Sequence, residues 1–456
     1  MSLIARLGGR TFASLHNHRN FRLYFASHAV SFAGTWMQQI ALYWLVFQLT
    51  SSPVAVGALA VAQLLPVTVF GLAVGQIIDR VDVRRLLLVT ESILAFASLA
   101  LAVLTLTGTV ELWHVYAIAT FQGLVLTLGN PARHTLVFRI VGSADLPNAI
   151  ALSSGLGTMA RIIGPGLGGI VVALAGPGVA FAVNSTTFGA TVTALLAMRV
   201  HDLVPIERPA GRARFSNLLR FVLRSRRVAV AFFAVLLLST VSFNFDVLLP
   251  LVAGETLDAG AGVFGLIAAV FGAGALCGAL FLAAFGRASL RLLLLGAGGF
   301  GVLELVLAPQ SSLLAVCILL VPTGICYVIW GSNALASLQL AAPPHLRGQA
   351  ASLYFFAFQG GAPFGGLLAG WLTSKGGTAL AFGVAGTSAI VVAVAGAAAL
   401  LTLEPGAARS DLRRMFRDNR GDGLGGTRDL GVSDQPVGDE SNPARVSLHA
   451  QDSPLR

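Results

Sequence analysis

Long apolar segments separated by short polar connections run through most of the chain. Runs such as 59–78, 86–107 and 380–403 reach about 20 residues, the length that a helix needs to cross a bilayer. They are about twice as long as the strands of a membrane barrel and lack strict alternation, which favours helices. A helix also satisfies its own backbone hydrogen bonds in lipid. The pattern therefore predicts an all-α membrane protein.

We predict twelve transmembrane helices in two pseudo-symmetric bundles of six, divided at the longest internal connection. In both halves an Asn late in an even-numbered span precedes a Pro-containing loop and a span with Pro followed by paired glycines. The predicted spans are residues 23–48, 54–78, 86–107, 113–136, 148–174, 178–199, 228–252, 261–285, 290–309, 312–338, 349–373 and 378–403. The predicted regions are a cytoplasmic segment 1–22, an N-terminal bundle 23–199, a linker 200–227, a C-terminal bundle 228–404 and a tail 405–456.

The linker and the tail differ in composition from the spans. FSNLLRFVLRSRR within 200–227 alternates apolar and basic residues at helical spacing, which predicts an amphipathic helix on the cytoplasmic lipid surface; a plain polar linker is the alternative. The tail is rich in Gly, Asp, Ser and Arg and is expected to be disordered.

Composition and charge agree with a membrane protein. The chain is 55% hydrophobic and 11% charged, and its net charge is +10. The excess arginine lies in short loops on one side of the spans, so we expect membrane lipid and no nucleic acid as a partner. The same bias predicts a multi-pass membrane protein with both termini in the cytoplasm.

Enzymatic chemistry has little support in the sequence. The three cysteines lie inside apolar spans without a CxxC or Cys/His cluster, so we expect no disulfide, no metal and no cofactor. GxSxG, HExxH and Walker patterns are absent from the sequence, which argues against an enzyme and against ATP as the driving force.

The loop GQIIDRVDVRR, residues 75–85, concentrates charge between the second and third spans. An acid here can pair with a basic residue or with the positive end of another helix, so the loop is predicted to latch the cytoplasmic side. The alternative is charge that only sets topology. The latch residues are Gly75, Asp79, Arg80, Arg84 and Arg85.

A second motif, RIIGPGLGG, lies in the fifth span. Proline removes a backbone hydrogen bond and bends a helix, and glycines allow close packing against a neighbour. A packing kink without a transport role is the alternative. The motif residues are Gly164, Pro165, Gly168 and Gly169.

Both motifs resemble those of the major facilitator superfamily. GQIIDRVDVRR resembles its signature loop GxLaDrxGrk, with Asp82 in place of a Gly, and DRvDxRR is similar to the drug and siderophore exporter branch that includes the enterobactin exporter. GPxxGG resembles the antiporter motif that the family associates with export. Ala119 stands where many antiporters have an Arg before the pair Gln122-Gly123, so that proton relay does not transfer.

The resemblance implies alternating access, proton antiport and a central cavity lined by spans one, four, seven and ten. The proton-coupling candidates are ionisable residues inside spans, each of which costs about 2.5–3.5 kcal/mol at the bilayer centre. Asp246 ranks first, while Glu91 could reach the interface, Glu304 could tie two helices and Arg161 could be a structural counter-charge. The candidates are Asp246, Glu304, Glu91 and Arg161.

Polar and aromatic residues at helical spacing give the candidates for the cavity wall, although ordinary helix packing explains any one of them equally well. They suit a bulky, amphipathic, neutral or weakly cationic cargo. The cavity candidates are His28, Thr35, Gln39, Tyr43, Asn130, Trp330 and Asn333.

The sequence and the resemblance thus predict a monomeric secondary transporter of a bacterial cytoplasmic membrane, which exports small amphipathic molecules in exchange for protons. A dedicated siderophore exporter shares every motif and stays open. A non-transporting membrane sensor or lipid-modifying protein is the more distant alternative.

Overall fold

The computed structural model describes residues 13–78, 81–204, 226–285, 289–341 and 347–403. Regular structure in these ranges is helical throughout, and the chain up to Leu403 forms one compact unit. The predicted surface helix in the linker and the tail 405–456 lie outside the described residues, as do Asp79 and Arg80. An all-helical architecture confirms the fold class predicted from the apolar runs.

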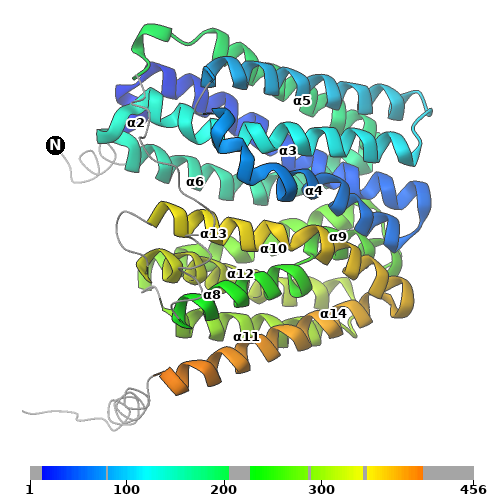
Figure 1. Ribbon diagram of the computed structural model, residues 1–456. Helices are drawn as coiled ribbons and strands as arrows, with labels where there is room; N and C mark the ends of the chain where they lie inside the picture. The colour runs from blue at the N-terminus through cyan, green and yellow to red at the C-terminus, as the bar shows by residue number, and fades with distance from the viewer. Residues whose placement is uncertain (1–12, 79–80, 205–225, 286–288, 342–346, 404–456) are drawn as a thin grey trace, which may run out of the picture. The chain divides into compact units, whose positions relative to one another are not determined.

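The N-terminal half contains helices that run side by side in Figure 1. They are α2 (Ala13–Asn17), α3 (Arg19–Thr50), α4 (Pro53–Ile78), α5 (Val83–Leu106) and α6 (Leu112–Leu196). The long α6 is not one straight rod, because Gly142 (φ 68°) and Gly176 (φ 79°) leave the helical conformation. Glycine adopts these positive φ values without a side-chain clash, so the chain reverses there and α6 supplies three successive segments.

The C-terminal half is built in the same way, with interruptions inside its helices. Its elements are α8 (Arg226–Leu237), η2 (Leu238–Ser242), α9 (Phe245–Leu251), η3 (Val252–Thr256), α10 (Ala261–Phe285), α11 (Leu290–Leu307), α12 (Leu313–Ala341), α13 (Arg347–Gly360) and α14 (Ala362–Leu403). Gly377 (φ 69°) divides α14.

Eight stretches among the described residues are long and apolar enough to cross a bilayer, counting α6 and the α13–α14 region as one stretch each. A multi-span helical membrane protein is therefore supported, and the number twelve stays a prediction. The exposed apolar side chains of these helices, such as Leu174, Phe96 and Leu314, fit a lipid-facing surface.

The span predicted over residues 228–252 lies within the apolar stretch Val228–Thr256, but its helix is interrupted at Phe243 and Asn244. Phe243 has φ −87°, ψ 76° and Asn244 has φ −123°, ψ 36°, and both lie between η2 and α9. The Asn244 side-chain amide donates to the backbone oxygens of Thr240 and Val241, which lack their usual helical partners at the break. Competition of this kind between an Asn side chain and the backbone is a common reason for a helix to stop.

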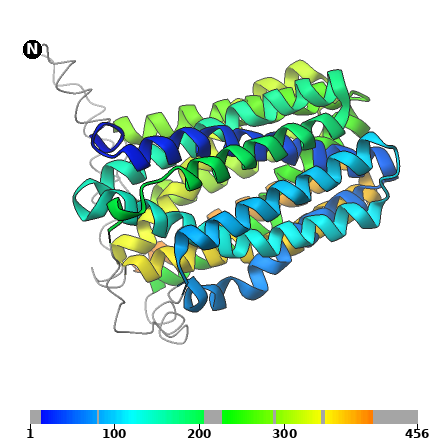
Figure 2. The same ribbon diagram turned by 90° about the horizontal axis from the view of Figure 1, so that it is seen from above.

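The helical unit has two ends. The end at which α3 and α5 begin carries Arg84, Arg139 and Arg199, and we call it the basic end. We call the other one the opposite end. Figure 2 shows from above that the helices of both halves run between these two ends.

Candidate functional site: a cavity between the two halves

A cavity of about 270 Å³ lies between the N-terminal and C-terminal halves. Its wall is mostly aromatic and apolar, with a few amides and two charged groups. This volume lies just below the range of about 300–1,000 Å³ that is typical of small-molecule pockets. The wall residues used below are Trp36, Gln39, Tyr43, Arg161, Pro165, Phe243, Asp246, Phe271, Tyr327 and Phe358.

Arg161 extends from the N-terminal half into this cavity. Its Nη1 donates to the hydroxyl oxygen of Tyr327 at 3.1 Å, and its guanidinium carbon lies 4.9 Å from the ring centroid of Trp36. The side chain is exposed to the space inside the cavity. Arg161 therefore combines a cation–π contact with one hydrogen bond to the C-terminal half.

Asp246 reaches the same cavity from the C-terminal half. It lies in the first turn of α9, directly after the break at Phe243 and Asn244, and its side chain is exposed. Among the described residues it forms no ion pair within 4.0 Å. The break therefore places a free carboxylate in the space that Arg161 also enters.

Stacked rings form the wall on the C-terminal side. The ring of Phe243 lies 4.3 Å from that of Tyr327, with the two planes 8° apart. Phe271 lies 4.7 Å from Phe245, and Phe358 lies 5.7 Å from Phe243. These contacts fix the broken segment of the helix and present ring faces to a bound molecule.

Glycines allow the two halves to touch at the opposite end. A side-chain carbon on Gly169 would collide with the backbone of Gly265 in α10, and one on Gly57 would collide with the carbonyl oxygen of Gly366. The remaining motif glycines face their own half: Gly164 packs on Ala33 and Trp36, and Gly168 packs on Met37. The motif in the fifth span thus connects α3 on one side with α10 on the other.

Glu91 forms an ion pair in the N-terminal half, near the basic end. Arg133 donates from Nε and Nη2 to Glu91 Oε1 at 3.1 and 2.9 Å, and from Nη1 to Asn130 Oδ1 at 3.0 Å. The Glu91 side chain is only 2% exposed. Glu91 is therefore paired inside the N-terminal half, and Asn130 serves this pair rather than the cavity wall.

Other candidates also lie outside the cavity wall. His28 stacks between Tyr24 and Phe32 at 5.2 Å from each ring, and Thr35 donates to the Ser31 carbonyl oxygen at 2.8 Å. In the C-terminal half, Asn333 Oδ1 accepts from the backbone N–H of Ser289 at 2.9 Å, which caps the start of α11.

Glu304 and Trp330 are buried polar residues with unusual surroundings. Both residues are fully buried. Among the described residues, the two carboxylate oxygens of Glu304 have no hydrogen-bond partner, and the indole N–H of Trp330 has none either. The side-chain tie between helices considered for Glu304 is therefore not formed in this conformation. A charged carboxylate in such a position is costly.

The described part of the charged loop binds within the N-terminal half. Arg84 donates from Nε and Nη2 to the carbonyl oxygens of Leu195 and Leu196, at 2.8 and 3.3 Å, near the end of α6. Asp82 caps α5 by accepting from the Arg85 backbone N–H at 2.9 Å. A cation at the carbonyl end of a helix is a favourable arrangement. Gly75 lies in α4.

A network of buried amides was not anticipated from the sequence. Gln38 Oε1 accepts from Ser98 at 2.7 Å and from Asn184 at 2.8 Å, while Gln38 Nε2 donates to Gln122 at 3.1 Å. In the sequence, Gln122 belongs to the Gln-Gly pair that follows Ala119, and this motif does not indicate its partners. Its polarity inside an apolar run was the available signal.

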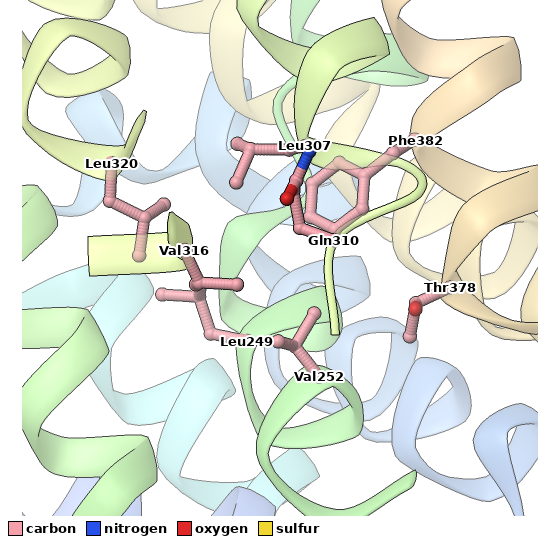
Figure 3. A pocket seen from close by; sticks show the side chains of 8 residues that line it. All are labelled: Leu249, Val252, Leu307, Gln310, Val316, Leu320, Thr378 and Phe382. Atoms are coloured by element: carbon pink, nitrogen blue, oxygen red, sulfur yellow. The ribbon is translucent and has the colours of Figure 1, made fainter. Parts of the chain in front are cut away.

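A second, much smaller cavity of about 10 Å³ lies at the opposite end of the C-terminal half. Figure 3 shows its wall, which is mainly aliphatic with one amide, Gln310, and one hydroxyl, Thr378. This space suffices for about one water molecule, so it does not accommodate a cargo. Among the described residues, no group of three or more His, Cys, Asp or Glu side chains could hold a metal ion.

Of the residues singled out in the sequence, the central cavity brings together Gln39, Tyr43, Arg161, Pro165 and Asp246.

The profile of the transmembrane secretion effector family matches residues 10–417.

Two relatives and one solved structure illustrate what the chain is similar to. The macrolide efflux protein A of Streptococcus pyogenes is 22% identical over 397 residues, which cover 82% of this chain and 95% of the relative. The staphyloferrin A transporter of Staphylococcus aureus is 23% identical over 268 residues, covering 57% and 66%. A crystal structure of a POT family transporter superposes with a TM-score of 0.68 at 13% identity, covering 85% of this chain and 96% of that chain.

The chain covers less than two thirds of the first curated relatives that it matches, namely 40% of an MFS-type transporter of Bacillus subtilis and 66% of the staphylococcal protein. The family profile nevertheless extends over most of the sequence, and the similar structure shares the fold. The relatives that are similar in sequence and the solved structure that is similar in fold are transporters and not enzymes. The chain is a multi-pass membrane protein and belongs to the transmembrane secretion effector family of the major facilitator superfamily.

Proposed function

We propose that the chain exports small amphipathic molecules from the bacterial cytoplasm by alternating access, in exchange for protons. The observation that carries the proposal is the cavity between the halves, which a charged side chain enters from each half. A site between two bundles changes its exposure when the bundles rock against each other. A relative named as a macrolide efflux protein supports outward movement of cargo.

The contacts between glycines support a cytoplasm-facing conformation. Gly57 meets Gly366 and Gly169 meets Gly265 at the opposite end, where the halves approach closely. The excess of arginine at the basic end supports a cytoplasmic location for this end. Cargo would then enter from the cytoplasm and leave once these contacts separate.

Asp246 is the proposed proton carrier. Glu91 is already bound by Arg133, and Glu304 is enclosed on all sides, whereas Asp246 opens into the cavity. A carboxylate in the cavity exchanges a proton with whichever side the cavity faces. Proton binding there would favour release of cargo outside.

Transport into inverted membrane vesicles tests the proposal, over dyes, antibiotics and siderophores, with and without a pH gradient. We expect uptake of at least one compound that depends on the gradient. Asp246→Asn should abolish the dependence on pH, whereas Asp202→Asn, at an exposed site at the basic end, should not. Unchanged pH dependence in Asp246→Asn would reject this carboxylate as the carrier.

A dedicated siderophore exporter is the second candidate, because one relative is named as a staphyloferrin A transporter. Transport of siderophores alone in the same screen would favour it. Transport of chemically unrelated drugs and dyes would favour the broader exporter.

A further inference from the structure

The cavity holds two opposite charges that come from different halves. Arg161 belongs to α6 and Asp246 to α9, and both side chains are exposed to the cavity. Among the described residues they are not within 4.0 Å of each other, nor does either form another ion pair. Because both side chains line the same cavity, a third group in the cavity can contact both of them.

Most of the hydrogen-bonding capacity of Arg161 is unused. A guanidinium has five N–H donors, and only the Nη1 bond to Tyr327 is formed with described side chains. The Trp36 ring and the Tyr327 hydroxyl hold the group in place without neutralising it. A planar carboxylate is the ligand that best matches such a fork, because it accepts two parallel hydrogen bonds.

Asp246 offers the complementary site. A protonated amine is attracted by a carboxylate, and ring faces next to it favour a cation as well. Phe243 and Tyr43 lie in the same wall. One side of the cavity therefore attracts a negative group and the other a positive group, with aromatic surface between them.

We propose that the cargo is a zwitterion with an apolar or aromatic body, whose carboxylate binds Arg161 and whose amine binds Asp246. This inference rests on the proposed function, because it assigns the cargo class of the same cavity. Such a molecule bridges the two halves and draws them together. A proton on Asp246 competes with the amine, so cargo and proton bind in turn, as an antiporter requires. The sequence led us to expect a neutral or weakly cationic cargo, because Arg161 was not among the residues expected in the cavity wall.

Equilibrium dialysis of the purified full-length chain tests this with a matched set of probes that share one ring system. The set is 2-naphthylalanine and the dipeptide glycyl-2-naphthylalanine as zwitterions, 3-(2-naphthyl)propionate as the carboxylate alone, and 1-(2-naphthyl)propan-2-amine as the amine alone. The two zwitterions differ in the separation of their charges. We expect at least one of them to bind about tenfold more tightly than either singly charged probe, since each charge-assisted hydrogen bond contributes on this scale.

Substitutions assign each charge to a residue. Arg161→Gln should lower the affinity of the zwitterion to that of the amine alone, and Asp246→Asn should lower it to that of the carboxylate alone. Arg161→Lys keeps the charge but not the fork, so it should retain part of the affinity. The control variants Arg199→Gln and Asp202→Asn change the same charges at exposed positions of the basic end and should leave all affinities unchanged.

The outcomes separate this inference from the proposed function. If a singly charged probe binds as tightly as both zwitterions and enters inverted vesicles, the zwitterion inference is overturned while the exporter stands. If none of the probes binds and the vesicle screen finds no cargo, both fail. Should Arg161→Gln fold poorly, Arg161→Lys and Asp246→Asn still decide, because the ratio of zwitterion to singly charged affinity must fall in each.

Discussion

The N-terminal and C-terminal halves differ in the side-chain contacts that connect the helices within each half. In the N-terminal half, buried side chains hydrogen-bond to one another across helices, as around Gln38 and between Glu91 and Arg133. In the C-terminal half, stacked rings are prominent around the cavity, as between Phe243 and Tyr327 and between Phe271 and Phe245. Hydrogen bonds between side chains demand one geometry, whereas ring contacts persist over a range of offsets.

This difference indicates which half deforms more easily. The broken helix at Phe243 and Asn244 lies among the rings, and its regular backbone hydrogen bonding is already interrupted there. The amide network joins α3, α5 and α6 into one unit. We therefore expect the N-terminal half to move as a rigid body and the C-terminal half to adjust around the cavity.

The largest effect on stability is expected from Glu91→Ala. Removing one member of a buried ion pair leaves Arg133 uncompensated, and this typically costs about 3–5 kcal/mol. The melting temperature of the detergent-purified chain should fall steeply. The double variant Glu91→Leu with Arg133→Met should recover much of the loss, because no buried charge then remains. Equal melting temperatures for Glu91→Ala and the unmodified chain would refute the role of this pair.

The next largest effect is expected from Gln38→Leu. Gln38 is 7% exposed and bonds to three side chains, so its loss leaves buried polar groups without partners, at a cost of about 1–3 kcal/mol. The matched control is Gln63→Leu, because among the described residues the Gln63 side chain hydrogen-bonds only to Gln39, in a half-buried pair. A thermal unfolding series should rank Gln38→Leu well below Gln63→Leu. If the two variants unfold together, the network does not act as the tie we describe.

In the C-terminal half, Phe271→Leu should cost less stability. The substitution keeps an apolar side chain and loses the ring contact with Phe245, which is worth about 0.5–1.5 kcal/mol. Since Phe271 also lines the cavity, transport should weaken more than stability does. Transport in vesicles and melting temperature, measured on the same preparation, distinguish the two effects. A loss of stability as large as that of Gln38→Leu would contradict the contrast between the halves.

The sequence predicted the fold because lipid imposes a simple rule on it. Apolar runs of the right length must be helices, and the described residues confirm this. The cavity was predictable only in part. Tyr43, Gln39 and Asp246 lie in its wall as expected, whereas Trp330 and Asn333 are held in helix packing.

Helical periodicity in the sequence does not show where a helix stops being regular. A stripe along an ideal helix assumes that the helix continues, yet Phe243 and Asn244 interrupt it. Partners far apart in the sequence were equally hidden. Nothing in the spacing relates Arg133 to Glu91, 42 positions away, or Gln38 to Asn184, 146 positions away.

The smallest effect on stability is expected from Asp145→Asn. Asp145 lies at the surface of the N-terminal half, at the basic end, and contacts polar side chains there. Asp145 Oδ2 lies 2.8 Å from His18 Nε2 and accepts from Asn17 Nδ2 at 3.4 Å. Hydrogen bonds with His18, and then with Asn17, hold the pKa of the Asp145 carboxyl below its ordinary value. Both side chains of the His18–Asp145 pair are over a quarter exposed, at 28% and 27%, so water and salt weaken the contact.

The sign of the pH dependence follows from that lowered pKa. The folded carboxylate is favoured, so the stabilisation is fully present above the unfolded pKa of about 3.9 and disappears as the pH falls through the lower folded pKa. Hydrogen exchange of residues 13–20, corrected for the intrinsic rate, should therefore lose protection only in this acidic range. Asp145→Asn should already show weaker protection at pH 7 and little further change on acidification. Ser14→Ala, which removes the 3.1 Å bond to the Asp145 carbonyl oxygen but keeps the carboxylate, should lower protection and preserve the acid transition. If the acid transition persists in Asp145→Asn, another group causes it. The polar contacts that stabilise the N-terminal half would then not extend to Asp145 at the basic end.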